Sequence, residues 1–94
     1  MGTLKTRDII YSLNKKGFVQ DEKDHKFFYL YVNYKKTKVF TFISQGENEI
    51  DDGLIGLMAG QTKLRKKNFL DLIKCPLSFE GYIKILIENG HISI

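Results

Sequence analysis

Residues 25–43, HKFFYLYVNYKKTKVFTFI, hold seven of the twelve Phe and Tyr residues of this 94-residue chain. The first part, Lys26 to Val32, is aromatic and β-branched and contains no Gly or Pro, as is typical of a strand. Thr37 to Ile43 repeats the pattern, and the polar segment from Asn33 to Lys36 between them predicts a turn. The stretch therefore predicts an antiparallel β-hairpin.

Both faces of this hairpin are apolar, because successive residues of a strand point to opposite sides of the sheet. On the first strand, one face carries Phe27, Tyr29 and Tyr31, and the other carries Phe28, Leu30 and Val32. We expect two helices to cover one face. For the other face we expect either the C-terminal helices or a partner subunit, such as a second copy of the chain.

The flanking segments predict helices with defined ends. Thr6 is a candidate N-cap of a first helix, which Gly17 ends, and a short strand follows over Phe18 to Gln20. Asp51 is the expected N-cap of a second helix. In that helix Gly56 and Gly60 have a spacing that suits close backbone packing. Two more helices follow, separated by Pro76 and with Ser78 as the N-cap of the last one.

The predicted fold class is therefore α+β, with the order α-β-β-β-α over residues 1–64. We expect a three-stranded antiparallel sheet with helices on one face. Residues 65–94 are expected to form a C-terminal extension of two helices packed on the same domain.

Composition limits the class of protein. No apolar run approaches the roughly 20 residues that span a membrane, and the N-terminus lacks the pattern of a secretory signal. The lone Cys75 excludes an internal disulfide and favours a cytoplasmic location. The two histidines are far apart in the sequence, so we expect no metal site and no cofactor.

The positive charge is concentrated in the first half of the chain. Residues 1–38 contain nine Lys and Arg against four Asp and Glu, whereas residues 39–94 contain six against seven. Such a bias favours a polyanionic partner, and nucleic acid is the simplest one. A solvated lysine surface explains the charge equally well.

Three segments are similar to the HicA toxins of bacterial and archaeal toxin–antitoxin systems. Thr6 to Phe18 resembles the opening helix of that family and its Gly-Phe exit. His25, with Phe28 three residues later, resembles its histidine-bearing strand. Gly46 to Leu64 resembles its second helix, which starts here with Glu49-Ile50-Asp51-Asp52-Gly53-Leu54. The three segments also follow the order and spacing of that family, so the resemblance covers residues 4–64.

This resemblance implies a fold like that of double-stranded RNA-binding domains and a small ribonuclease that cleaves mRNA without a metal. Its implied partners are RNA and a HicB-like antitoxin. The chain departs from the family in two places. Lys23-Asp24 precedes the histidine, where the family has Gly-Ser, and Ile43-Ser44-Gln45 stands where many members have Pro-His.

His25 is the candidate catalytic residue, because imidazole can accept and donate a proton near neutral pH. It would accept the proton of a ribose 2′-hydroxyl or protonate the leaving oxygen, and Asp24 is a candidate to orient it. Five lysines complete the candidate site. Lys23 and Lys26 would stabilise charge on the phosphate, and Lys35, Lys36 and Lys38 would hold the RNA backbone.

Two other functions fit the same residues. One is a nucleic-acid-binding module of this fold without catalysis, in which Phe27, Tyr29 and Tyr31 stack on bases. The other is a protein-interaction domain in which the C-terminal helices form the docking surface. In that case the same aromatic side chains serve in a core or an interface.

Overall fold

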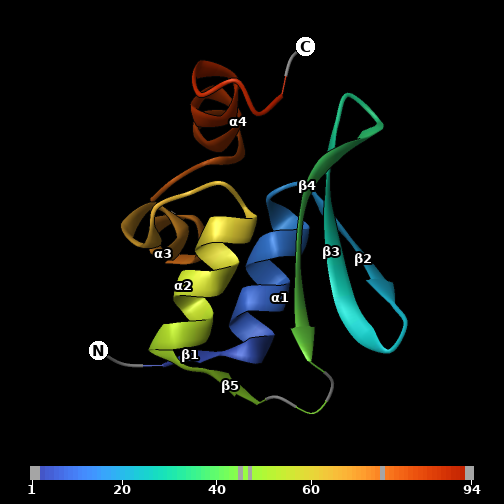
Figure 1. The fold of residues 1–94 in the computed structure, drawn as a ribbon, viewed down its shortest axis with the longest axis vertical. Helices are drawn as coiled ribbons and strands as arrows, with labels where there is room; N and C mark the ends of the chain where they lie inside the picture. The colour runs from blue at the N-terminus through green and yellow to red at the C-terminus, as the bar shows by residue number, and fades with distance from the viewer. Residues whose placement is uncertain (1–2, 45, 47, 75, 93–94) are drawn as a thin grey trace.

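The computed structural model describes residues 3–44, 46, 48–74 and 76–92 (Figure 1), so Cys75 lies outside the described residues. The chain is α+β, as predicted. Its elements are β1 (Leu4–Lys5), α1 (Thr6–Lys15), β2 (Phe18–Glu22), β3 (His25–Val32), β4 (Lys35–Ser44), β5 (Glu49–Ile50), α2 (Asp52–Gln61), α3 (Lys66–Lys74) and α4 (Phe79–Glu88).

The main sheet is three-stranded and antiparallel in the order β2-β3-β4, which confirms the predicted hairpin. The strands run further than predicted, because the turns are shorter. Asn33 and Tyr34 alone connect β3 to β4, and both have positive φ angles, of 53° and 65°. Two left-handed central residues suit the right-handed twist of a hairpin, so the strands pair as far as Val32 and Lys35.

A second sheet, which the sequence did not predict, is formed by β1, just before α1, and β5, just before α2. It pairs Leu4 with Ile50 and Lys5 with Glu49 in an antiparallel arrangement. The backbone N–H of Thr6 also donates to the carbonyl of Asn48, with 3.0 Å between the two atoms. The start of α1 is thereby fixed beside the segment that leads into α2.

Side-chain caps begin two of the helices as expected. The Asp51 carboxylate accepts a hydrogen bond from the Leu54 N–H at 2.9 Å, and the Ser78 hydroxyl accepts one from the Gly81 N–H at 3.1 Å. The prediction that Thr6 caps α1 was wrong. Thr6 is already helical, and the N-cap residue is Lys5, whose side chain makes no capping bond to a described residue.

Of the predictions about glycines, the one for Gly17 was confirmed and the one for Gly56 and Gly60 was not. Gly17 ends α1 with a φ of 92°, as expected of a left-handed terminus, and its missing side chain leaves room for the Phe79 ring. The prediction that Gly56 and Gly60 permit close backbone packing was wrong. A Cβ at either position would meet no described atom within 4 Å.

The C-terminal helices belong to the same hydrophobic core as the sheet. Phe69 and Leu72 of α3 and Leu86 of α4 are fully buried in it. Tyr82 of α4 stacks on Phe18 of β2, with ring centroids 6.0 Å apart. Burial of these side chains is the main favourable contribution that the two helices make to folding.

Polar contacts tie α1 to the same C-terminal region. The Ser12 hydroxyl donates to the carbonyl of Ile73 at 2.7 Å. The buried Lys16 ammonium donates to the carbonyls of Leu72 and Leu77. Because buried polar groups are costly unless they are paired, these bonds specify how α3 packs on α1.

The helices lie on one side of the main sheet and leave its other side open (Figure 1). On β3, Phe28, Leu30 and Val32 are buried on the helical side, whereas the alternate residues remain partly exposed. The expectation that α3 and α4 cover this second face was wrong, because both helices join the core on the α1 side. We call the uncovered side the outer face.

Among the residues that the structure describes, no helix is both long and apolar enough to cross a membrane.

Candidate nucleic-acid interface

Aromatic side chains from two strands meet on the outer face. The strand register places Phe27 of β3 opposite Phe42 of β4, and Tyr29 opposite Phe40. His25 begins the same side of β3, opposite Ser44. We call His25, Phe27, Tyr29, Phe40 and Phe42 the aromatic row.

The rings of the aromatic row contact one another along its whole length. The centroids of His25 and Phe42 are 5.4 Å apart, and their planes are inclined by 21°. The centroids of Phe27 and Phe42 lie 5.6 Å apart, and those of Phe27 and Tyr29 lie 6.0 Å apart. The Tyr29 and Phe40 centroids are separated by 5.9 Å. These distances are typical of favourable aromatic pairs, so the rings support one another on an otherwise open surface.

The sequence placed Phe40 and Phe42 on one face of the third strand, but the residues proposed for stacking were Phe27, Tyr29 and Tyr31 alone. Their signal was present, because Phe40 and Phe42 alternate with the buried residues Val39, Thr41 and Ile43. Phe40 is 40% exposed. An aromatic side chain on the uncovered alternate positions of a strand is the pattern that could have found them.

A cation lies at the end of the row nearest the β3–β4 turn. The Lys36 ammonium is 3.9 Å from the centroid of the Tyr29 ring, within the range of a cation–π interaction. Lys36 pairs with Tyr31 across the sheet, and the strand register shifts between Tyr29 and Tyr31. Lys36 therefore lies on the same side of the sheet as Tyr31, beside the row.

His25 lies at the opposite end of the row, with its ring partly exposed. Its Nδ1 atom is buried and has no hydrogen-bond partner among the described residues. The Asp24 carboxylate accepts from the backbone N–H of His25 at 3.1 Å, so it does not orient the imidazole as predicted. A general base usually has such an orienting partner on its second nitrogen.

Among the predicted lysines, Lys23 stays near His25. Its backbone N–H donates to the His25 carbonyl at 2.9 Å, and its exposed ammonium pairs with Asp21 at 3.7 Å. Lys26 lies opposite the buried Ile43 and therefore points to the helical side of the sheet, away from the His25 ring.

Lys35, Lys36 and Lys38 are all exposed and lie toward the turn end of the hairpin. With a rise of about 3.3 Å per residue, the length of β3 separates Lys35 from His25 by roughly 20 Å. Lys35 lies opposite the buried Val32 and therefore points to the helical side, as Lys26 does. The structure thus brings Lys36 close to the Tyr29 end of the aromatic row, and His25 to its other end.

This arrangement offers rings, cations and one imidazole along one face of a sheet. In the part of the chain that the structure describes, no three His, Cys, Asp or Glu side chains gather into a group that could hold a metal ion. The outer face thus combines flat apolar groups, which can stack, with ammonium groups, which can contact phosphates.

In the comparisons with known proteins, no family model, no curated protein and no solved structure matches this chain, and the likeness of residues 4–64 to the HicA toxins stays a prediction.

Proposed function

We propose that the outer face binds single-stranded RNA, with bases on the aromatic row and the backbone along Lys36 and Lys38. The observation that carries this proposal is the Lys36 ammonium over the Tyr29 ring, beside a row of rings that none of the described helices covers. Rings combined with cations are the usual composition of a surface for unpaired bases and their phosphates.

Charge favours RNA over a second copy of the chain as the occupant. The chain has a formal net charge of +4, and the exposed Lys36 and Lys38 lie on the side of β4 that carries the row. Two positive faces repel each other, whereas a polyanion releases counterions when it binds. Asp21 is the carboxylate on the outer face nearest Phe27, and it is already paired with Lys23.

The resemblance to the HicA toxins is a second support, because that family acts on mRNA. With it we propose that residues 4–64 form a domain like those that bind double-stranded RNA, that the protein works in the cytoplasm and that a HicB-like antitoxin is its protein partner. On this proposal, residues 65–94 complete the core of the same domain.

The test is fluorescence anisotropy with a labelled single-stranded RNA and with the matching duplex. We expect tighter binding of the single strand. Tyr29→Ala should weaken it by about 5-fold to 150-fold, since one stacked base contributes about 1–3 kcal/mol. Tyr11→Ala is the matched control, because Tyr11 is an aromatic residue 66% exposed on α1.

Equal loss in the two variants would contradict the proposal. The protein could instead form a concentration-dependent dimer that the Tyr29→Ala substitution dissociates, with no change in RNA affinity. That result would assign the outer face to self-association. Circular dichroism of both variants checks that they fold.

A second candidate function is RNA cleavage by His25, favoured by the position of this imidazole in the same aromatic row. An RNA on the row would bring a ribose to His25. The imidazole would take the proton of the 2′-hydroxyl, whose oxygen would attack the adjacent phosphorus. The 5′-oxygen would leave and take a proton from water, and the products would be a 2′,3′-cyclic phosphate and a 5′-hydroxyl.

An assay of end-labelled RNA cleavage with the His25→Ala variant distinguishes RNA cleavage from RNA binding alone. We expect the variant to lose cleavage by about 100-fold or more, as for the removal of a general base, and to keep most of its binding. His91→Ala is the control, since His91 is exposed beyond the end of α4. Unchanged cleavage in His25→Ala would rule out the catalytic role.

A further inference from the structure

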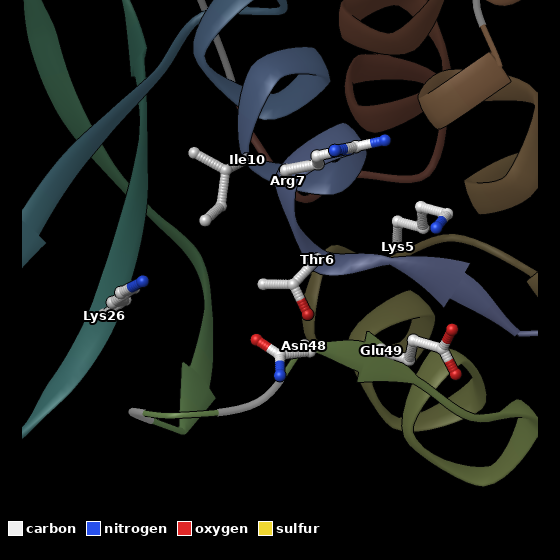
Figure 2. Close-up of a pocket in the computed structure, with 7 residues that line it drawn as sticks. All are labelled: Lys5, Thr6, Arg7, Ile10, Lys26, Asn48 and Glu49. Atoms are coloured by element: carbon white, nitrogen blue, oxygen red, sulfur yellow. The ribbon is translucent and has the colours of Figure 1, made fainter.

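A second cationic site lies on the helical side of the sheet, away from the aromatic row. A pocket of about 400 Å³ opens between the start of α1, the approach to β5 and the first part of β3 (Figure 2). Its walls come from segments that are far apart in the sequence. The lining residues are Lys5, Thr6, Arg7, Ile10, Lys26, Asn48 and Glu49.

Three of the lining residues are cationic and one is anionic. Figure 2 shows the Lys26 ammonium facing the space bordered by Thr6, Ile10 and Asn48. Lys5 and Arg7 extend on the other side of the α1 start, where Glu49 lies. Glu49 lies opposite Lys5 in the register of the β1–β5 sheet, so both side chains are on the same side of it, and Lys26 is the cation that faces the pocket.

The N-terminus of α1 adds donors to the same wall. The Thr6 N–H is used by the Asn48 carbonyl. The N–H groups of Arg7 and Asp8 belong to the first turn, where a helix offers no internal acceptor, and the N-cap side chain of Lys5 supplies none. A ten-residue helix also has a positive dipole end at this point.

The Thr6 hydroxyl is the independent sign of a missing ligand. Thr6 is only 5% exposed, and its Oγ1 atom is buried without a hydrogen-bond partner among the described residues. Figure 2 shows this oxygen turned toward Asn48, another residue of the pocket wall. An unpaired buried hydroxyl is costly, so its retention beside cations and free N–H groups is explained if an acceptor binds there.

We propose that this pocket binds a phosphate group. The phosphate oxygens accept hydrogen bonds from the Lys26 ammonium, the Thr6 hydroxyl and the Arg7 and Asp8 N–H groups. The positive end of α1 favours the double negative charge, as at other helix N-termini that bind phosphate. The site does not depend on the RNA surface proposed above, because it lies on the other side of the sheet.

The test is an NMR titration of ¹⁵N-labelled protein with inorganic phosphate at constant ionic strength. We expect saturating shifts of the Arg7 and Asp8 amide signals. Lys26→Met should weaken phosphate binding by about tenfold, the loss expected for one charge-assisted hydrogen bond. Lys67→Met is the matched control, since it removes an exposed lysine of α3 that does not line the pocket.

The Thr6 variants separate binding from folding. Thr6→Val removes the hydroxyl at constant shape, so it should weaken phosphate binding and raise the unfolding midpoint without phosphate. Thr6→Ser should keep the affinity. Shifts that rise linearly without saturation, or equal affinities of Lys26→Met and Lys67→Met, would overturn the proposal.

Two RNA oligonucleotides then identify the source of the phosphate. If a 5′-phosphorylated strand shifts the Arg7 and Asp8 signals and its 5′-hydroxyl form does not, the ligand is a terminal phosphate. If inorganic phosphate binds and neither strand shifts these signals, the ligand is a small free anion. Both results uphold the phosphate site. Tyr29→Ala should leave phosphate binding unchanged, which distinguishes this site from the outer face.

Discussion

The Lys36 ammonium lies 3.9 Å from the centre of the Tyr29 ring, so a cation and a ring share one point of the outer face. The contact joins the turn end of the β3–β4 hairpin to the aromatic row. A phosphate that neutralises Lys36 would therefore place its own base close to Tyr29. Lys36 is therefore the lysine that we expect to contact a phosphate next to a stacked base.

Lys36→Met should weaken RNA binding and reduce its salt dependence. The slope of log K against log salt should become less negative by about 0.7, the value for one phosphate contact on a single strand. The free energy of unfolding should change by less than about 1 kcal/mol, as for an exposed cation–π pair. Lys67→Met makes the same charge change on α3 and should leave the slope unaltered. Identical slopes in the two variants would argue against a Lys36 phosphate contact.

Tyr82→Phe should destabilise the protein at neutral pH. The buried Tyr82 hydroxyl donates to the carbonyl of Thr62 at 2.8 Å, and its loss leaves that carbonyl unpaired. We expect a decrease of about 1–3 kcal/mol in the free energy of unfolding, measured with urea. Tyr11→Phe is the control, since Tyr11 is exposed and should change stability little. A Tyr82→Phe protein as stable as the native one would show that this bond contributes nothing.

The same tyrosine predicts a loss of stability at alkaline pH. Burial raises the pKa of the Tyr82 phenol far above the ordinary value of 10.0. Above about pH 10 the unfolded chain releases this proton and the folded chain retains it, so the unfolding free energy falls as the pH rises. The stability difference between the native protein and Tyr82→Phe should therefore shrink between pH 9 and about pH 11. A constant difference over this range would contradict the burial effect.

The ion pair between Lys66 and Asp52 predicts a small effect at acid pH. The hydrogen bond from Lys66 lowers the pKa of the Asp52 carboxyl below its ordinary value of 3.8. The pair therefore stabilises the fold above about pH 4 and loses this effect as the pH falls through the lowered pKa. Lys66→Met should lower the melting temperature slightly at pH 7, and the difference should vanish near pH 2. The neighbouring Lys67→Met should show no such trend.

Gly17→Ala should destabilise the protein by about 2 kcal/mol or more. Gly17 has a φ of 92°, which costs an L-residue about 1–2 kcal/mol, and a Cβ there would lie 2.5 Å from the Phe79 ring. Gly56→Ala is the contrasting variant, because its Cβ would meet no described atom within 4 Å and α2 would gain about 0.5–1 kcal/mol. Denaturant unfolding of both variants measures the difference. Similar changes in both would contradict the structural argument.

The features that sequence predicted well are those that short segments determine. Asp51 and Ser78 cap their helices through bonds to residues three positions away, and Gly17 ends α1 through its own φ angle. The β1–β5 pairing was missed because two-residue strands have no periodic signal and depend on contacts across the fold.

The candidate site was harder to predict because its geometry depends on which face of the sheet stays open. Both faces of β3 are apolar, so the pattern did not reveal that α3 and α4 join the inner core. Lys26 shows a different kind of error. Its adjacency to His25 suggested a shared role, yet neighbours on a strand point to opposite faces, and Lys26 lines the pocket beside α1.

The position of α4 also constrains how the protein is made. Tyr82 and Leu86 are completely enclosed, and Tyr82 stacks on Phe18, which is translated 64 residues earlier. During translation α1, the hairpin and α2 emerge first, and the part of the core that α4 covers stays exposed until Leu86 has left the ribosome tunnel. A nascent chain stalled before that point should be a target for chaperones and proteases.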